Sequence, residues 1–373
     1  MTQIDITYIL NARWPTVRAY GLQVAKMCQG FKQTGAKVRL LVPWRALHRE
    51  LRDLTPAQIY GIRDEFRIIR LPSMDFARMY SNNKSLFLIQ QAFFATFSAI
   101  YLLFRPSQVV YSRDPFTLYF LSFIRKDLYW EMHRMPEDMN RFVYKRIIRC
   151  VRGIVVISHG IRDRLVSYGY TSDRVFIAPD GIDLEEQGDD NVATSIAREK
   201  RLVVYTGQLL DWKGVGVLVD AAQLLDDAYI VVIVGGQPSE IALLRKSDTG
   251  GRIVFTGFVP HARALGWMRA AQVLVLPNLK DGSISEFYTS PLKMFEYMAS
   301  GNPIVASDLP SLREVLNDRN AVFVVPGDAA SLAQGIMRAA AEKGRELARC
   351  AREDVVNYTW ENRAKRIIEF IYQ

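Results

Sequence analysis

The chain has 373 residues, of which 49% are hydrophobic and 23% charged, and its net charge is +9. This composition is typical of globular proteins and excludes a disordered or fibrous chain, while the length predicts about two domains. The charge is unevenly distributed. Lys and Arg outnumber Asp and Glu in residues 1–180, whereas Asp and Glu slightly outnumber Lys and Arg in residues 181–373. A basic half favours an anionic membrane surface or a phosphorylated substrate as partner. No zinc finger, aromatic RNA-binding signature or basic helix accompanies it, so we expect no nucleic-acid partner.

The cysteines give no sign of a metal site or a disulfide framework. Cys28, Cys150 and Cys350 are far apart in the sequence, and the four histidines are equally scattered. This pattern favours a reducing compartment, and we expect neither a metal nor another cofactor. The N-terminal residues predict a strand with no basic segment before it, so no secretory signal is expected. We therefore predict a cytoplasmic protein, either free or peripheral on the cytoplasmic face of the membrane.

The first half alternates strands with helices, which predicts a parallel sheet covered on both faces. The uncharged segment 86–104 is long enough to be a transmembrane candidate. Because Gln90, Gln91, Thr96 and Ser98 interrupt it and a strand follows at once, we expect a buried or membrane-surface helix instead. The expected elements of this half are strands at 4–10, 37–42, 66–70, 108–111, 128–131 and 153–157, and a helix at 18–34.

The second half repeats this pattern after a polar, Gly- and Asp-rich linker at 185–200. We expect domains at 1–184 and 200–355, with a last helix in 356–373 that packs back toward the first domain. Ligands of such sheets bind at the carboxyl ends of the strands. The expected elements are strands at 202–206, 229–234, 252–255, 273–276, 303–306 and 321–324, and helices at 215–225, 264–271 and 291–300.

The segment 285–307 carries the most chemistry, because polar groups gather where a helix is expected to begin. Ser290 is suited to cap that helix and Pro291 to occupy its first position. Lys293 and Glu296 lie three residues apart and share a face. Two interpretations of Glu296 stay open at this point: it grips a ligand hydroxyl, or it is a solvated carboxylate on an amphipathic helix.

Several segments together resemble glycosyltransferase family 4, a family of retaining enzymes with the GT-B fold. The resemblance covers nearly the whole chain and depends on the order of its segments rather than on any one glycine-containing loop. It implies an α/β fold of GT-B type, with two doubly wound Rossmann-like domains facing a central cleft. The segments that carry it are 19–42, 129–133, 155–161, 177–183, 205–214, 234–236, 255–260 and 290–301.

The resemblance also implies roles for individual residues. Lys213 would bind the diphosphate of a UDP- or GDP-type sugar, Glu296 its ribose hydroxyls, and His133 would face the donor sugar and the acceptor. The start of the 291–300 helix would support the phosphates, and the loop at 257–261 would line the base. The further residues expected to bind substrate are Gly207, Gln208, Gly235, Gly236, Val259, Thr289, Ser290 and Lys293.

Three departures from the family pattern leave alternatives open. Many members have an arginine where this chain has Gln208, which carries no charge. An acid is usual eight residues before Glu296, where this chain has Tyr288, and Glu286 could replace it only with a longer loop. The glycine-rich first loop is absent, and Arg13 and Arg18 in its place either contact phosphate or are merely solvated.

We therefore expect a retaining glycosyltransferase, of hexosyltransferase type, that acts in glycan or polysaccharide biosynthesis. Its partners would be a nucleotide-diphosphate sugar, a saccharide or lipid-linked acceptor, and an anionic membrane surface. Two alternatives stay open: a sugar-nucleotide epimerase with the same fold, and a non-catalytic sugar-nucleotide-binding scaffold.

Overall fold

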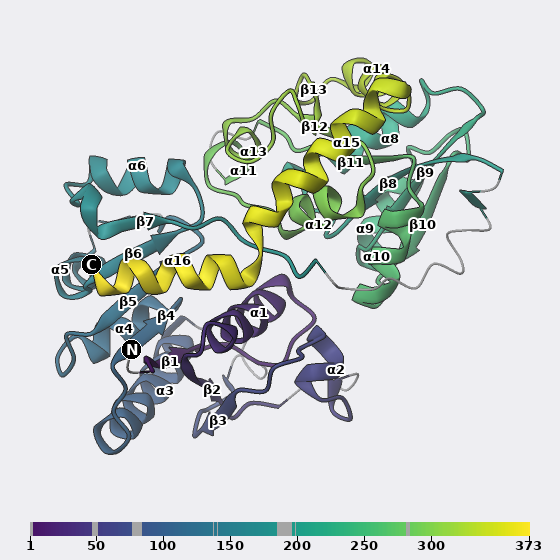
Figure 1. The fold of residues 1–373 in the computed structure, drawn as a ribbon. Coiled ribbons are helices and arrows are strands. Elements are labelled where there is room, and N and C mark those ends of the chain that lie inside the picture. The colour runs from purple at the N-terminus through teal and green to yellow at the C-terminus, as the bar shows by residue number, and fades with distance from the viewer. Residues whose placement is uncertain are drawn as a thin grey trace. The chain divides into compact units, whose positions relative to one another are not determined.

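The computed structural model describes residues 3–46, 51–76, 84–136, 138–139, 141–184, 196–197, 199–280 and 284–373. These residues form two compact units (Figure 1). The first comprises Met1–Ile157, Ile161–Pro179 and Trp360–Gln373, and the second comprises Ser158–Gly160 and Asp180–Thr359. The chain leaves the first unit after Pro179, before the boundary expected at 184, and returns to it at Trp360. The predicted linker at 185–200 lies mostly outside the described residues.

Within the described part of the first unit, seven parallel strands form one sheet in the order β3-β2-β1-β4-β5-β6-β7. Every residue of β4, β5 and β6 is buried, as strands covered by helices on both faces require. The strands are β1 Asp5–Ile9, β2 Lys37–Pro43, β3 Arg67–Leu71, β4 Val109–Ser112, β5 Leu128–Met132, β6 Gly153–Val156 and β7 Val175–Ile177.

The last helix of the chain, α16, packs against α1 in this unit (Figure 1). Its buried residues recur at helical spacing, and Arg363 lies among them. Gly30 of α1 lets the two backbones approach closely, since a Cβ there would lie 2.5 Å from the carbonyl oxygen of Trp360. The helices are α1 Ala19–Gln33, α2 Pro56–Tyr60, α3 Lys84–Phe104, α4 Pro115–Leu121, α5 Phe142–Cys150, α6 His159–Ser167 and α16 Trp360–Tyr372.

Helix α3 corresponds to the uncharged segment at 86–104. Over Ser85–Phe104 its mean hydropathy is 1.7, so by length and composition it could cross a membrane, and 33% of that apolar window is buried. The helix packs against α4, with Phe94 and Ser98 fully buried. Leu103 and Phe104, at its end, are 64% and 80% exposed. One face therefore belongs to the core of the unit, and the other presents apolar side chains to the outside.

In the described part of the second unit, six parallel strands form a sheet in the order β10-β9-β8-β11-β12-β13. Successive side chains of β8 enter different core clusters, Val204 one and Val203 and Tyr205 the other. Both faces of the sheet are therefore covered, as predicted. The strands are β8 Arg201–Thr206, β9 Tyr229–Val234, β10 Ile253–Gly257, β11 Val273–Leu276, β12 Ile304–Ser307 and β13 Val322–Val324.

The helices of this unit place the segments expected to bind the donor. Helix α12 is tied to the end of β8, because the backbone amide of Thr206 donates to Tyr297 Oη at 2.9 Å. The helices are α8 Val215–Ala222, α9 Pro238–Arg245, α10 His261–Ala270, α11 Ile284–Phe287, α12 Leu292–Ser300, α13 Pro310–Arg313, α14 Ala329–Ala339 and α15 Glu342–Asp354.

Candidate functional site

Two glycines bring the ends of β8 and β9 together in the second unit. Gly207 follows β8 with φ +128°, and Gly235 follows β9 with φ +115°. A Cβ on Gly235 would lie only 2.3 Å from the carbonyl oxygen of Gly207, so no other residue allows this approach. A Cβ on Gly236 would likewise lie 2.3 Å from Leu209 Cδ1. The predicted glycine loops thus form one tight backbone surface at the carboxyl ends of two strands.

The amine of Lys293 is buried beside this surface. Its residue is 8% exposed, and within the described residues Nζ has no hydrogen-bond partner. The amine lies 3.6 Å from the centroid of the Tyr205 ring. Burial lowers the pKa of Lys293 well below its ordinary value, and nearby Lys213 lowers it further, while Glu296 opposes both. A buried amine without an acceptor is unfavourable in the free protein, which is typical of a binding site.

Lys213 borders the same space from another element. It ends the short 3₁₀ turn Asp211–Lys213, which leads into α8, and its Nζ lies 5.2 Å from the centroid of the Trp212 ring. Burial lowers the pKa of Lys213 as well. A Cβ on Gly207 would lie 4.0 Å from both Lys213 Nζ and Lys293 Cδ. Two lysine side chains thus converge beside Gly207, an arrangement that an anion would stabilise.

Glu296 lies one helical turn after Lys293 on α12, with its side chain 13% exposed. Its Oε1 is 3.6 Å from Nε2 of His261, the first residue of α10. Val259, which precedes α10, is partly buried and packs against a core cluster of the sheet. Glu296 therefore lies between a lysine and a histidine, and it is not a solvated residue on an open helix face.

The predicted start of the 291–300 helix was wrong by one residue. Pro291 is the N-cap with extended backbone, and α12 begins at Leu292 without a side-chain cap. The hydroxyl of Ser290 accepts a hydrogen bond from the backbone amide of Asp180 at 3.2 Å instead. Local capping preference was overridden here by a contact with a segment more than a hundred residues earlier. Thr289 is half-buried next to it.

Glu286 and Tyr288 occupy the place where the family acid is expected. Glu286 is 8% exposed and lies in α11, with Oε1 at 3.4 Å from Lys280 Nζ. Tyr288 follows α11 and is half-buried, and its backbone amide donates to Ile284 at 3.2 Å. Gln208 is exposed, and its backbone carbonyl accepts a hydrogen bond from Tyr205 Oη at 2.7 Å.

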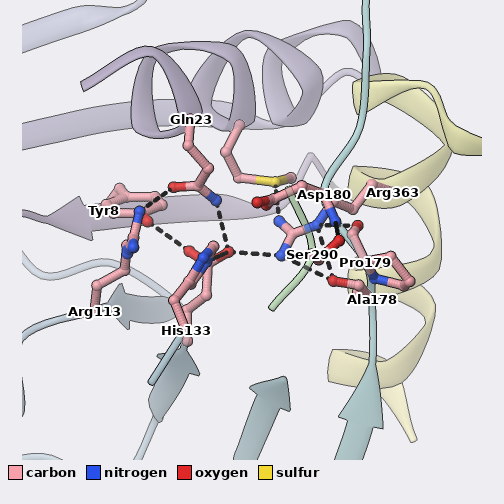
Figure 2. Close-up of polar contacts among 11 residues, drawn as sticks. Tyr8, Gln23, Arg113, His133, Ala178, Pro179, Asp180, Ser290 and Arg363 are labelled. Carbon is pink, nitrogen blue, oxygen red and sulfur yellow. Dashed lines mark hydrogen bonds and ion pairs between the residues drawn. The ribbon is translucent and has the colours of Figure 1, made fainter. Parts of the chain in front are cut away.

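In the first unit, polar contacts converge on Glu131 of β5, whose side chain is fully buried (Figure 2). Its carboxylate accepts hydrogen bonds from Tyr8 Oη at 2.5 Å, Gln23 Nε2 at 2.8 Å and Arg363 Nη2 at 2.7 Å. His133 Nε2 lies 3.1 Å from the same carboxylate. Burial tends to raise the pKa of Glu131, but Arg363 and His133 outweigh it and hold the pKa well below its ordinary value.

A cavity of about 390 Å³ lies beside His133 in the first unit. Its wall includes the Trp130 and Tyr144 rings, which stack with centroids 6.1 Å apart. The cationic residues of the wall are Arg113, Arg134 and Arg141.

Neither arginine of the first loop lines this cavity. Arg13 forms an ion pair with Asp75 at 2.9 Å, so its charge is already partnered. The side chain of Arg18 is exposed at the start of α1.

Three participants received no role from the sequence. Tyr205 and Glu131 lie in segments that carry the family resemblance, and Arg363 lies in none of them, although two further signals were present. Glu131 is the one charged residue of an otherwise apolar strand, and Arg363 lies on the apolar stripe of the last helix. Among the described residues, no group of three or more His, Cys, Asp or Glu side chains is placed to hold a metal ion.

The arrangement of two units, each a parallel sheet with helices on both faces, defines the GT-B fold. Anabaena Alr3699/HepE, crystallised with UDP and glucose, superposes with a TM-score of 0.74 at 13% identity, over 99% of this chain and 100% of that one. This likeness concerns the fold alone.

Two family models match consecutive parts of the sequence. Residues 21–186 match the model described as Glycosyltransferase Family 4, and residues 200–342 match Glycosyl transferases group 1. The chain belongs to this family of glycosyltransferases.

The curated relatives share only part of the chain. It is 31% identical to a phosphatidyl-myo-inositol mannosyltransferase of Mycobacterium leprae, over 44% of each chain. It is 26% identical to a D-inositol 3-phosphate glycosyltransferase of Xylanimonas cellulosilytica, over 64% of this chain and 61% of that one. The chain therefore spans about half the length of the curated relatives it matches.

Proposed function

We propose that this protein transfers a sugar from a nucleoside-diphosphate sugar to an acceptor, with retention of configuration at the anomeric carbon. The observation that carries the proposal is the convergence of Lys213 and Lys293 beside Gly207. Two desolvated amines close to each other form an unfavourable pair in the free protein, which Glu296 offsets only in part. A diphosphate supplies the missing negative charge, and each amine then gains a charge-assisted hydrogen bond.

The same two lysines account for catalysis in this proposal. As the bond between the sugar and the diphosphate breaks, negative charge grows on the leaving phosphate oxygens. Fixed cations stabilise that charge more in the transition state than in the bound donor, which lowers the barrier. Glu296 binds the ribose hydroxyls, and the backbone around Gly235 and Gly236 lines the base. The acceptor attacks from the face that the diphosphate leaves, and the protein chiefly orients the two substrates. We expect no metal to take part.

The cavity beside His133 supports an acceptor that carries an anionic group. Three arginines contribute to its wall, and the stacked rings of Trp130 and Tyr144 supply an apolar surface of the kind that sugars pack against. Two relatives are named for acceptors with a phosphate, phosphatidyl-myo-inositol and D-inositol 3-phosphate. We propose a phosphate-bearing acceptor, lipid-linked or free, with His133 as the side chain nearest the transferred sugar.

A membrane surface is the proposed location of a lipid-linked acceptor. The exposed apolar residues Leu103 and Phe104 of α3 lie in the same unit as Phe123 and Phe142, which are 58% and 71% exposed. Helix α5 adds Lys145, Arg146 and Arg149. Apolar side chains among cations are the physical requirement for attachment to an anionic interface. The protein would then be cytoplasmic and peripheral on the membrane.

A donor screen followed by product analysis tests the proposal. Thermal shifts with UDP, GDP and their sugars identify the nucleotide, and the selected donor is then incubated with and without phosphorylated acceptors. Transfer to an acceptor supports the proposal. Conversion of the donor sugar without an acceptor would instead show an epimerase, and binding without turnover of any donor would show a scaffold.

A further inference from the structure

The carboxylate of Glu131 has more donors than a simple ion pair needs, and Figure 2 labels these donors, Tyr8, Gln23, His133 and Arg363. Oε2 accepts from Tyr8, and Oε1 is approached by Gln23, Arg363 and His133 at 2.8, 2.7 and 3.1 Å. Each oxygen of an ionised carboxylate offers about two lone-pair positions, so the three groups at Oε1 share that oxygen and leave it no further capacity. Every donor comes from a different part of the first unit, and the carboxylate cannot turn without breaking several bonds at once.

We infer that Glu131 is a positioning residue for His133, and that Arg363 of the last helix sets the strength of this interaction. The inference rests on the proposed function, in which His133 lies at the reacting sugar. It adds to that function a second layer, Glu131 and Arg363, which touches no substrate. The C-terminal helix thereby becomes part of the acceptor-side site.

The ionised carboxylate fixes the position of the proton on the imidazole. Because Glu131 is ionised, its oxygens only accept hydrogen bonds. Nε2 of His133, which lies 3.1 Å from Oε1, must therefore carry a hydrogen. In the neutral ring the lone pair is then on Nδ1. A carboxylate behind a histidine fixes both the tautomer and the plane of the ring in this way.

The charges near His133 act on its protonation in opposite directions. An anion close to an imidazole favours its protonated form, and a cation opposes it. Glu131 therefore favours protonation of His133, and Arg363, which is bound to the same carboxylate oxygen, opposes it. Gln23 connects Glu131 to a second cationic side chain. Its Nε2 donates a hydrogen bond to Glu131, and its Oε1 accepts one from Arg113 at 2.6 Å. Among the described residues, the other charged side chains of the cavity wall beside His133 are those of Arg134, Asp138 and Arg141.

The contacts of Arg363 and the exposure of His133 distinguish this role from simple anchoring of the last helix. Arg363 also donates to the backbone carbonyls of Ala178 and Pro179, so it has structural contacts of its own. If Arg363 only anchored the last helix, its ion pair with Glu131 would be enough, and contact of His133 with the same carboxylate would not be needed. Both residues line the cavity, but the side chain of His133 is 14% exposed whereas that of Glu131 is fully buried. The imidazole is the group through which the buried charge can influence a ligand.

Histidine-selective NMR tests the inference without any substrate, because the chain has only four histidines. The His133 signal is assigned from its loss in His133→Gln. In the wild-type protein, long-range ¹H–¹⁵N spectra at high pH should show hydrogen on Nε2. Glu131→Gln should lower the measured pKa of His133 by about one unit or more, and Arg363→Met should raise it. These opposite shifts are not expected of a structural anchor.

Two further variants keep the test decisive. If either single variant fails to fold, the double variant Glu131→Gln/Arg363→Met removes both charges together and should still lower the pKa relative to wild type. Glu296→Gln is the matched control, since it removes a carboxylate near His261 and should leave the His133 titration unchanged. A neutral wild-type ring with hydrogen on Nδ1, or a His133 titration that no Glu131 variant moves, overturns the inference. Nucleotide thermal shifts report separately on the proposed function.

Discussion

The amine of Lys293 lies 3.6 Å from the centroid of the Tyr205 ring, and no hydrogen-bond acceptor within the described residues reaches it. A cation over an aromatic face gains roughly 0.5–2 kcal/mol, which is less than the hydration that a buried ammonium loses. The position is therefore costly to the free protein. The buried amine of Lys293 becomes favourable only when an anion binds beside it. Because Lys213 supplies a second cation beside the same glycine, an anion with more than one negative charge is favoured.

Lys293→Met should stabilise the ligand-free protein. Methionine keeps most of the apolar stem and removes the desolvated amine, so we expect the free energy of unfolding to rise by about 1–3 kcal/mol. Thermal unfolding without nucleotide measures this effect. Lys246→Met, at an exposed position of the same unit, is the control and should change stability by less than about 0.5 kcal/mol. A clear loss of stability in Lys293→Met would mean that the amine has a structural partner.

The stability difference between these two proteins should depend on pH. The pKa of Lys293 in the folded state lies well below the ordinary 10.5, chiefly because of burial. Between the folded and unfolded pKa values the unfolded state binds more protons, so stability rises with pH in that window. The free energy of unfolding of the wild type should therefore approach that of Lys293→Met as pH rises toward 10.5. Denaturant unfolding at several alkaline pH values checks this, and a constant difference would argue against a desolvated amine.

Glu131 should contribute stability with the pH dependence of a carboxylate. Its folded-state pKa lies well below the ordinary 4.5, because Arg363 and His133 outweigh burial. The contribution is full above the unfolded pKa and is lost as pH falls through the folded one. At neutral pH, Glu131→Gln removes the buried carboxylate that Arg363 and His133 contact and should cost about 3–5 kcal/mol. Unfolding between pH 7 and pH 3 should show this cost shrinking with acid, and an unchanging cost would contradict it.

The fold was largely predictable from the sequence. Buried parallel strands are short, continuous apolar runs. Gly153–Val156 and Val273–Leu276 are such runs, and their places in a sequence that alternates strands with helices identify them as strands. The start of α12 was not predictable from the sequence. Ser290 is suited to cap a helix, but its hydroxyl accepts a hydrogen bond from the backbone amide of Asp180 instead. Element ends depend on such distant contacts, which local propensity does not contain.

The sites were predictable only in part, and for the same reason. Lys213 and Lys293 were each singled out, but their convergence beside Gly207 joins segments that only the folded sheet brings together. Glu131 and Arg363 are 232 positions apart in the sequence. A lone charge in an apolar strand, and another on the apolar stripe of a helix, are the signals that could have paired them.

Attachment to membranes should depend on the exposed apolar residues of the first unit. Flotation with vesicles of anionic phospholipid should recover the wild type, and with neutral phospholipid much less. Leu103→Ser/Phe104→Ser should reduce recovery several-fold, because burial of each large side chain contributes about 1.5–3 kcal/mol. Leu243→Ser, which alters a residue 66% exposed in the second unit, is the matched control. Equal recovery of all proteins, or none of the wild type, would exclude this surface.

Calorimetric titration with nucleoside diphosphates tests the central claim most directly. The wild type, Lys213→Met, Lys293→Met and the double variant are each titrated with UDP, GDP and the parent nucleosides, in two buffers of different ionisation enthalpy. We predict that the wild type binds one diphosphate far more tightly than its nucleoside, and that each lysine variant loses about tenfold or more, or 1.4 kcal/mol. Proton uptake on binding should be smaller in Lys293→Met, because an anion beside the amine raises its lowered pKa and so favours its charged form. Equal diphosphate affinity in the wild type and the double variant would contradict the account.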